Sequence, residues 1–279
     1  MKVSEVIKVA NKFITFNKNS ICKKDLFRLL SHATGIESYR LILEIDQDIE
    51  LNLPEFLSLI KLRLNGSPMS QIIGNRSFWK SDFIIDENVL DPRPESETIL
   101  EVALQVTKSP AKILDLGTGS GCLACSLSLE YPFASVIAID RSAAAIKIAK
   151  MNSRRLGCNI DFIQSFWVEG LAEKFDLIVC NPPYLSYNEY LALDQIVKNY
   201  EPQEALLPHM GEGCTGLESY LYFSTRIKNF LNKGGLALFE VGADQAPIVE
   251  KYFKRIDGSY IQSHKDINGR NRVISVLNM

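Results

Sequence analysis

The stretch Ala-Lys-Ile-Leu-Asp-Leu-Gly-Thr-Gly-Ser-Gly, residues 111–121, decides the fold of this chain. It predicts a short apolar strand, a turn with glycines at alternate positions, and a helix that begins near Cys122. Glycines in such a turn let the backbone approach a ligand closely at the helix N-terminus. A dinucleotide-binding turn would place its third glycine at the position of Cys122, since its pattern is Gly-x-Gly-x-x-Gly. The stretch therefore predicts an α/β sheet whose ligand is not a dinucleotide.

Apolar runs alternate with helical patterns from about Pro94 onward, which is typical of an α/β fold with a mostly parallel sheet. Strands are expected near residues 112–117, 135–140, 159–165, 176–181, 235–242, 259–266 and 271–278. Gly234 and Gly235 are expected to form the turn before the fifth strand. Because open α/β sheets bind ligands outside the carboxyl ends of their strands, the site is predicted at that edge.

Two aspartates are expected at this edge. Asp140 ends the second strand, where its carboxylate can accept hydrogen bonds from both hydroxyls of a ribose. Asp115 lies two residues before Gly117, where it would repel a pyrophosphate but favour the ammonium group of a methionine moiety. The two carboxylates therefore indicate a ligand with a ribose and a cationic amino-acid group.

The turn Asn181-Pro182-Pro183-Tyr184 follows the apolar run of residues 176–180 and indicates which chemical group of the substrate reacts. Two consecutive prolines remove two backbone donors, so the turn is rich in hydrogen-bond acceptors. The side-chain oxygen of Asn181 and a proline carbonyl can accept both N–H groups of a planar NH2, and Tyr184 can stack on it. The simpler alternative is a turn that only ends a strand.

The ordered set of Asp115–Gly121, Asp140 and Asn181–Tyr184 resembles the class I S-adenosylmethionine-dependent methyltransferases that act on planar nitrogens. Further motifs, spread over essentially the whole chain, resemble the peptide chain release factor glutamine N5-methyltransferases: Phe78-Trp79, Pro92 to Glu97, Tyr200-Glu201-Pro202, Glu240-Val241-Gly242 with Gln245, and Asp266, Gly269, Arg270 and Arg272. The resemblance implies S-adenosyl-L-methionine as the cofactor. It implies, as substrate, the glutamine of the Gly-Gly-Gln motif in peptide chain release factors, which would be the partners.

The resemblance also implies a set of site residues. Those expected to bind the cofactor are Asp115, Gly117, Thr118, Gly119, Ser120, Gly121, Asp140, Phe166, Trp167 and Asn181. The expected catalytic residues are Asn181, Pro182 and Tyr184, and the substrate is expected to contact Asn181, Pro182, Pro183 and Tyr184. This sequence has Phe166 where the family has an aspartate before the tryptophan. It therefore predicts that adenine is held by apolar contact and stacking on Phe166 or Trp167.

The fold implied is an α/β, class I Rossmann-like methyltransferase sheet with a small N-terminal helical domain and a connecting β-hairpin. The expected domains are a helical substrate-recognition domain at 1–70, a hairpin linker at 71–93 and the methyltransferase domain at 94–279, with hairpin arms around 78–79 and 83–85. Lysines and arginines between Lys2 and Arg28 precede an acidic stretch from Glu37 to Glu55. Such segregated charge predicts either a docking surface for a protein partner or simply solvated helix faces.

Composition narrows the class of protein. The 279 residues carry a net charge of −2, 46% of them are hydrophobic, and no run is long and apolar enough for a membrane span. A cytoplasmic enzyme without a signal peptide, a membrane contact or a stably bound nucleic acid is expected. Three histidines and six cysteines are scattered, so no metal site is predicted, and Cys122 and Cys125 are expected to be reduced. Two alternatives remain: a nucleic-acid exocyclic-amine N-methyltransferase, which should be more basic, and a non-catalytic cofactor-binding subunit.

Overall fold

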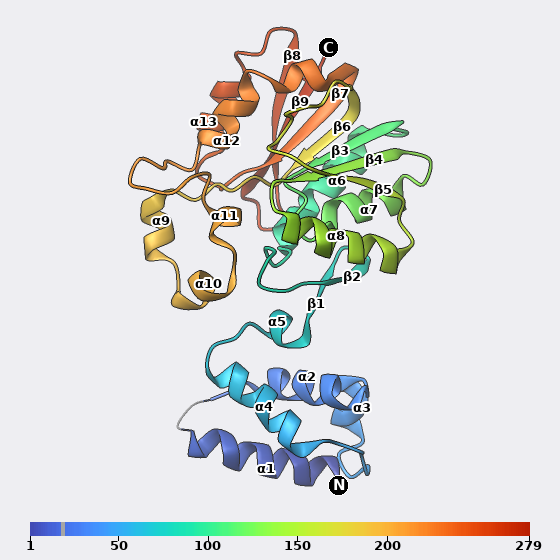
Figure 1. Cartoon of the computed structure of the whole chain (residues 1–279), viewed down its shortest axis with the longest axis vertical. Helices are drawn as coiled ribbons and strands as arrows, with labels where there is room; N and C mark the ends of the chain where they lie inside the picture. Colours follow the sequence, from blue (N-terminus) through green and yellow to red (C-terminus); the bar gives the residue numbers. More distant parts are fainter. Residues whose placement is uncertain (18–19) are drawn as a thin grey trace. The chain divides into compact units, whose positions relative to one another are not determined.

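The computed structural model describes residues 1–17 and 20–279, and these residues form two compact units, Met1–Gly74 and Asn75–Met279. The first unit is helical, and the second contains a seven-stranded sheet with helices on both faces (Figure 1). Lys18, one of the basic residues noted in the sequence, lies outside the described residues. No helix within the described ranges is long and apolar enough to cross a membrane.

The first unit consists of short helices around an apolar core. Its helices are α1 (Val3–Phe16), α2 (Lys23–Thr34), α3 (Ser38–Leu43), α4 (Leu53–Leu64) and α5 (Met69–Ile73). Helix α2 ends at Gly35, which adopts the left-handed conformation, and α4 begins at Asn52, whose side chain accepts a hydrogen bond from the Glu55 backbone N–H. Phe56 and Ile60 of α4 are fully buried among the apolar side chains of α1 and α2, so one face of each helix forms the core.

The second unit opens with a two-stranded hairpin of β1 (Asn75–Phe78) and β2 (Ser81–Ile84). Trp79 lies in the turn with φ of 53°, so the expected arm at 78–79 is wrong by one residue. Asn152 of helix α8 (Ala143–Leu156) fixes the hairpin to that helix, because its side chain both accepts from the Ile84 N–H at 2.7 Å and donates to the Ile84 carbonyl at 2.9 Å.

The sheet has the order β5-β4-β3-β6-β7-β9-β8. Its strands are β3 (Lys112–Leu116), β4 (Ser135–Asp140), β5 (Ile160–Gln164), β6 (Phe175–Cys180), β7 (Leu231–Glu240), β8 (Ser259–Lys265) and β9 (Asn271–Asn278). Neighbours from β5 to β7 are parallel, while β9 is antiparallel to both β7 and β8. All seven strands expected from the sequence are confirmed. Strand order reverses at β3, which has β4 on one side and β6 on the other, and ligands bind beside such a reversal.

Gly234 and Gly235 do not form a turn before the fifth strand of the sheet, as the sequence suggested, but lie within β7. Phe175 pairs with Leu231 whereas Leu177 pairs with Leu236, so the extra residues bulge out of the ladder there. Gly234 has φ of 77°, and a Cβ on Gly235 would come within 2.8 Å of the Phe175 carbonyl oxygen. The glycines are thus required by an irregular strand pairing rather than by a connection.

Alternate residues of β3 face the two apolar cores on opposite sides of the sheet. Ile113 faces the core under α6 (Glu97–Val106) and α7 (Cys122–Glu130), whereas Leu114 and Leu116 face the core under α12 (Glu218–Ser224) and α13 (Ala246–Phe253). Figure 1 shows α6, α7 and α8 (Ala143–Leu156) over one face and α12 and α13 over the other. The remaining short helices are η1 (Pro94–Ser96), α9 (Tyr187–Ala192), α10 (Gln195–Tyr200), α11 (Gln203–Leu206) and η2 (Ile227–Phe230).

Candidate active site

A cavity of about 310 Å³ lies at the carboxyl ends of β3, β4 and β6. Its lining includes these site residues expected from the sequence: Gly117, Gly119, Asp140, Phe166, Trp167, Asn181 and Pro183. The other expected residues, Asp115, Thr118, Ser120, Gly121, Pro182 and Tyr184, do not line it. Further walls come from the segment after β2, from the first turn of α8, from α11 and from α12. The cavity therefore lies where the strand order reverses, as predicted for the ligand site.

The glycine turn is held in place by backbone contacts. The N–H groups of Gly117 and Thr118 both donate to the Ile139 carbonyl, at 2.8 and 2.9 Å. Gly117, Gly119 and Gly121 all have positive φ, between 54° and 80°. A Cβ on Gly121 would lie 3.1 Å from the Ala149 Cβ, so its lack of a side chain lets α7 and α8 pack closely. Two of the glycines face the cavity, whereas Gly121 serves helix packing.

Asp140 connects the glycine turn to the end of β4. Its Oδ2 accepts from the Gly119 N–H and its Oδ1 from the Ser142 N–H, both at 2.9 Å. A carboxylate has about four acceptor positions, so two remain for a ligand in the cavity. Burial raises the pKa of this carboxyl above its ordinary value, although the two backbone donors oppose the shift.

Asp115 is buried behind the turn. Its Oδ2 accepts from the Thr118 hydroxyl at 2.6 Å and from the Ala124 N–H at 3.2 Å, while its Oδ1 is buried without a hydrogen-bond partner. Burial raises the pKa of the Asp115 carboxyl to about 7. A buried oxygen with no donor is costly, and a nearby cation would relieve that cost.

Aromatic side chains form one wall of the cavity. Trp167 has φ of 50°, and a Cβ on Gly117 would come within 3.3 Å of its ring, so the glycine allows the indole to lie against the turn. The edge of the indole packs on Phe223 with ring centroids 4.9 Å apart. Phe166 is 43% exposed and packs edge-on against Tyr222. Both aromatic residues expected to stack on adenine thus border the cavity.

Asn181 follows β6 and is oriented by two buried side chains. Its Nδ2 donates to the Ser96 hydroxyl at 3.0 Å, and that hydroxyl donates to Glu240 Oε2 at 2.5 Å. Ser96 and Glu240 are 3% and 1% exposed, and burial raises the pKa of Glu240 to about 7. Sequence patterns placed Ser96 and Glu240 only among the motifs of the family resemblance, with no role. The sequence signal that could have found Glu240 is a single carboxylate at the end of an apolar run, residues 236–239, which becomes strand β7.

The segment after Asn181 is anchored from behind. The Gln245 side chain donates to the Tyr184 carbonyl at 2.7 Å, and the Ser219 hydroxyl donates to the Pro183 carbonyl at 3.4 Å. A Cβ on Gly216 would lie 2.3 Å from the Tyr184 carbonyl oxygen, so only glycine fits there. The Tyr184 ring packs against the sheet core, and burial raises the pKa of its hydroxyl to about 12. These contacts fix the backbone of the turn independently of any ligand.

Unfolding experiments at several pH values test the two raised carboxyl pKa values. Asp115 and Glu240 hold protons in the folded protein that the unfolded chain, with ordinary pKa values of 3.8 and 4.5, has already released at pH 5. Their stabilising contribution is complete below those ordinary values and is lost as the pH rises through about 7. Between about pH 5 and 6.5 each carboxyl should lower the free energy of unfolding by about 1.4 kcal/mol per pH unit.

Urea denaturation of the ligand-free protein at pH 5, 6 and 7 is the measurement. The free energy of unfolding should fall less steeply with pH in Asp115→Asn and in Glu240→Gln, because each variant lacks one of the two carboxyls that lose a proton. If both variants keep the full pH dependence of the original protein, the two carboxyls are ionised in the folded state and the prediction is wrong.

The fold and the site define a class I methyltransferase, and comparisons with known proteins agree. Residues 95–206 match the model of the methyltransferase small domain family. A methyltransferase structure from Pyrococcus furiosus, 16% identical, superposes with a TM-score of 0.51 over 72% of this chain and 87% of that one, which shows the fold.

The family follows from longer matches. A release factor glutamine methyltransferase of Cereibacter sphaeroides is 36% identical over 258 residues, covering 90% of each chain. Another, of Bacillus subtilis, is 32% identical over 286 residues, covering 99% of this chain and 97% of that protein. The chain belongs to the release factor glutamine methyltransferase family.

Proposed function

We propose that this protein transfers the methyl group of S-adenosyl-L-methionine to the side-chain amide nitrogen of the glutamine in the Gly-Gly-Gln motif of a peptide chain release factor. The observation that carries the proposal is the fixed Asn181 side chain at the wall of the cavity, within an Asn-Pro-Pro-Tyr turn. Family membership supports the same reaction. Because release factors act in translation, we expect the reaction to take place in the cytoplasm.

The cavity residues fit the cofactor. The two remaining acceptor positions of Asp140 suit ribose hydroxyls. Asp115 does not line the cavity, but its buried, unpartnered Oδ1 favours a positive charge near the glycine turn. Trp167 and Phe166 offer aromatic surface for adenine, in place of the carboxylate that the family resemblance implies at position 166. Of the expected cofactor residues, Thr118, Ser120 and Gly121 would act by shaping the turn, because their own contacts are with the protein.

When bound, the cofactor supplies an electrophilic methyl group on a sulfonium. The protein's task is then to present a glutamine amide, whose nitrogen is a poor nucleophile because its lone pair is delocalised into the carbonyl. The Asn181 side-chain oxygen, at the cavity wall, would accept one N–H of the NH2 group and stabilise the positive charge that develops on it. The expected second acceptor is the carbonyl of Pro182, the next residue, although Pro182 is buried and does not line the cavity. Preorganised acceptors of this kind require no strong base before the attack.

A count of protons explains the orientation of Asn181. The Ser96 hydroxyl has one proton, and it goes to Glu240 when that carboxyl is ionised. The same hydroxyl can then only accept from the Asn181 amide group, which turns Nδ2 toward Ser96 and the side-chain oxygen away from it. Ser96 and Glu240 thus position Asn181 as an acceptor, the role that the chemistry requires.

A nucleic-acid amine methyltransferase would use the same turn, but the net charge of −2 does not favour a phosphate-rich substrate. The deciding experiment incubates the protein with labelled S-adenosylmethionine and, in separate reactions, a release factor or DNA. Label should appear on the glutamine of the release factor. Label on DNA alone would replace the proposed substrate, and label on neither would favour a non-catalytic subunit.

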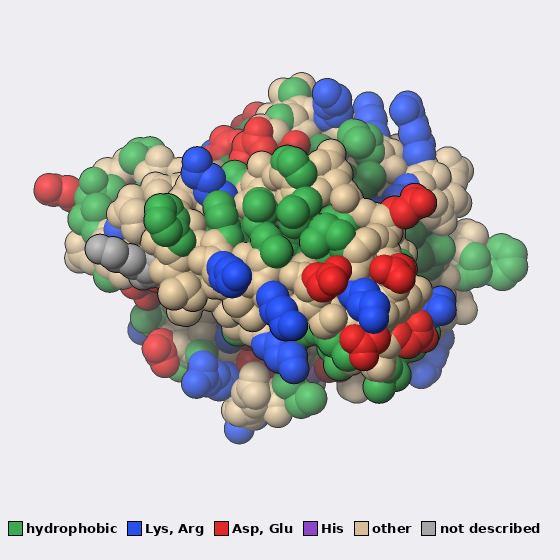
Figure 2. Space-filling view, turned by 90° about the horizontal axis from the view of Figure 1, so that it is seen from below, with side chains coloured by type: hydrophobic (Ala, Val, Ile, Leu, Met, Phe, Trp, Pro, Cys, Tyr) green, Lys and Arg blue, Asp and Glu red, His purple; other side chains and the backbone are tan. Residues whose placement is uncertain are grey.

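The helical unit would recognise the body of the release factor. Several of its apolar side chains are exposed: Phe16, Tyr39, Ile42, Leu43 and Leu62. Figure 2 shows one face of the molecule on which hydrophobic side chains gather, with lysine, arginine and acidic side chains around them; it labels no residue, so the exposed side chains named here are not assigned to that area. An apolar patch with a charged border is typical of a protein-binding surface.

Two side chains of α3 provide a test of this docking role. Tyr39 is 61% exposed and Leu43 is 77% exposed, so replacing both with alanine should cost little stability. We expect kcat/KM on an intact release factor to fall by about 10-fold or more, the scale of truncating central interface residues. Activity on a short Gly-Gly-Gln peptide should stay the same. Phe133→Ala, at a 99% exposed position outside the helical unit, is the matched control. Equal losses on protein and peptide would contradict docking through α3.

A further inference from the structure

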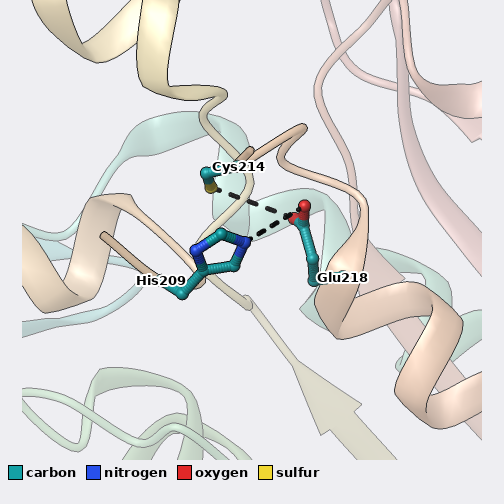
Figure 3. A group of neighbouring side chains, drawn as sticks. All are labelled: His209, Cys214 and Glu218. Carbon is teal, nitrogen blue, oxygen red and sulfur yellow. Dashed lines mark hydrogen bonds and ion pairs between the residues drawn. The ribbon is translucent and has the colours of Figure 1, made fainter. Parts of the chain in front are cut away.

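Three side chains from one short region, His209, Cys214 and Glu218, converge beside the cavity (Figure 3). His209 and Cys214 lie in the connection between α11 and α12, and Glu218 lies in the first turn of α12. One ligand atom of each lies within 4.8 Å of the others. The closest pairs are His209 Nε2 and Glu218 Oε1, 3.6 Å apart, and Cys214 Sγ and Glu218 Oε2, 3.9 Å apart.

The histidine ring is oriented by the backbone. Its Nδ1 lies 3.1 Å from the Met210 carbonyl oxygen, which can only accept, so Nδ1 carries a proton and donates to it. In the neutral ring Nε2 then has a lone pair, and that lone pair faces a carboxylate oxygen. Two acceptors that face each other require a cation between them, either a proton on Nε2 or a metal ion.

The other two groups would provide the further ligands that a metal ion needs. Cys214 is 4% exposed, and its sulfur lies 3.6 Å from the Leu185 carbonyl. The N–H and the hydroxyl of Thr215 both donate to Glu218 Oε1, while the Cys214 thiol donates to Oε2 at 3.9 Å. Oε2 is therefore the oxygen that would bind a metal ion once that thiol has lost its proton. Metal-binding histidines and carboxylates in proteins are oriented by hydrogen bonds of this kind.

We infer that His209, Cys214 and Glu218 bind one zinc ion. A thiolate sulfur, an imidazole nitrogen and a carboxylate oxygen are all zinc ligands, and three protein ligands leave the fourth tetrahedral position to water. Tetrahedral distances need ligand atoms somewhat closer together than they are here, so binding would draw the three side chains inward. The Cys214 thiol loses its proton to solvent when the metal–sulfur bond forms.

The site would brace the substrate turn. The Tyr187 N–H donates to the Cys214 carbonyl at 3.0 Å, and Gly216 lies directly against the Tyr184 carbonyl. Glu218 itself lines the cavity. Zinc would therefore hold one cavity wall and the residues after Asn-Pro-Pro-Tyr in a single arrangement. This inference stands apart from the proposed substrate, because the metal site consists of residues outside the transfer chemistry.

Cobalt(II) is the probe, since it replaces zinc and reports its ligands by absorption. The full chain, freed of metal with a chelator, should bind one equivalent of Co²⁺ with visible bands of a tetrahedral site and a near-ultraviolet thiolate-to-cobalt band. Zn²⁺ should displace it. Cys214→Ser should abolish the thiolate band, and His209→Ala should weaken affinity by at least 10-fold. Cys22→Ser, at an exposed cysteine, should change nothing.

A thermal measurement provides a second test that does not depend on spectra. Zn²⁺ at about 100 times its Kd should raise the melting temperature by about 4 °C in the original protein and in Cys22→Ser, but not in His209→Ala. His209 is exposed, so that variant should fold even if Cys214→Ser does not. Absence of the thiolate band would leave a proton on Nε2 as the cation between His209 and Glu218, and a melting shift that persists in His209→Ala would place the zinc at other residues. Either result would overturn the inference.

Discussion

Replacing Asn181 with alanine is expected to lower the rate of methyl transfer by about 10²–10³-fold, the usual loss when one preorganised partner of a transition state is removed. The Asn181 side chain is held by Ser96, and its oxygen is turned away from that contact. Because the acceptor would bind the substrate amide, affinity for S-adenosylmethionine should change little. Single-turnover kinetics at saturating cofactor measure the transfer step directly.

Variants of Ser96 separate positioning from direct contact. Ser96→Ala keeps the Asn181 side chain but removes the hydroxyl that orients it, so we expect the rate of methyl transfer to fall by about 10-fold. Ser96→Thr retains a hydroxyl and is the matched control, with a rate close to that of the original protein. An Asn181→Ala rate within threefold of the original would remove Asn181 from the transfer step. If Ser96→Ala and Ser96→Thr both transfer the methyl group at the rate of the original protein, Ser96 does not position Asn181, and the role of Asn181 itself is unaffected.

Replacing Asp140 with alanine is expected to weaken S-adenosylmethionine binding by about 1.5–3 kcal/mol, the scale of hydrogen bonds to a charged group. This corresponds to a rise in Kd of roughly 10- to 150-fold. The carboxylate faces the cavity and has two acceptor positions left after its bonds to the Gly119 and Ser142 N–H groups. Titration calorimetry gives the affinity.

The Asp140 side chain also holds the glycine turn, so a loss of cofactor contact has to be distinguished from a distorted turn. Asp140→Asn keeps one acceptor oxygen for the backbone and is expected to lose less affinity than the alanine variant. Thermal unfolding of both variants shows whether the turn has been destabilised. Cofactor affinity that stays unchanged in Asp140→Ala would place the ribose elsewhere.

Local patterns in the sequence were sufficient for most of the fold. Strand patterns predicted the seven sheet strands within a few residues. A buried parallel strand such as β3 or β6 is almost continuously apolar, whereas the antiparallel edge strand β8 mixes half-buried and exposed residues. The hairpin arm at Trp79 and the turn at Gly234-Gly235 were wrong, because a tryptophan with positive φ and a bulge inside a strand arise from tertiary contacts. Trp79 donates its backbone N–H to Glu97 and its indole N–H to Glu130, both distant in sequence.

The sequence by itself determined the strands, the glycine turn, Asp140 at the end of its strand and the Asn-Pro-Pro-Tyr turn, because each depends on residues that are neighbours along the chain. Only the tertiary structure decided which side chains meet across the sheet. Ser96 bonds to both Glu240 and Asn181, which end or follow the neighbouring strands β7 and β6, although Ser96 and Glu240 are 144 residues apart. His209, Cys214 and Glu218 are close in the sequence, but their spacing follows no helix or strand period, so only the path of the loop between α11 and α12 brings them together. Contacts of this kind depend on strand order and loop path, which no local pattern encodes.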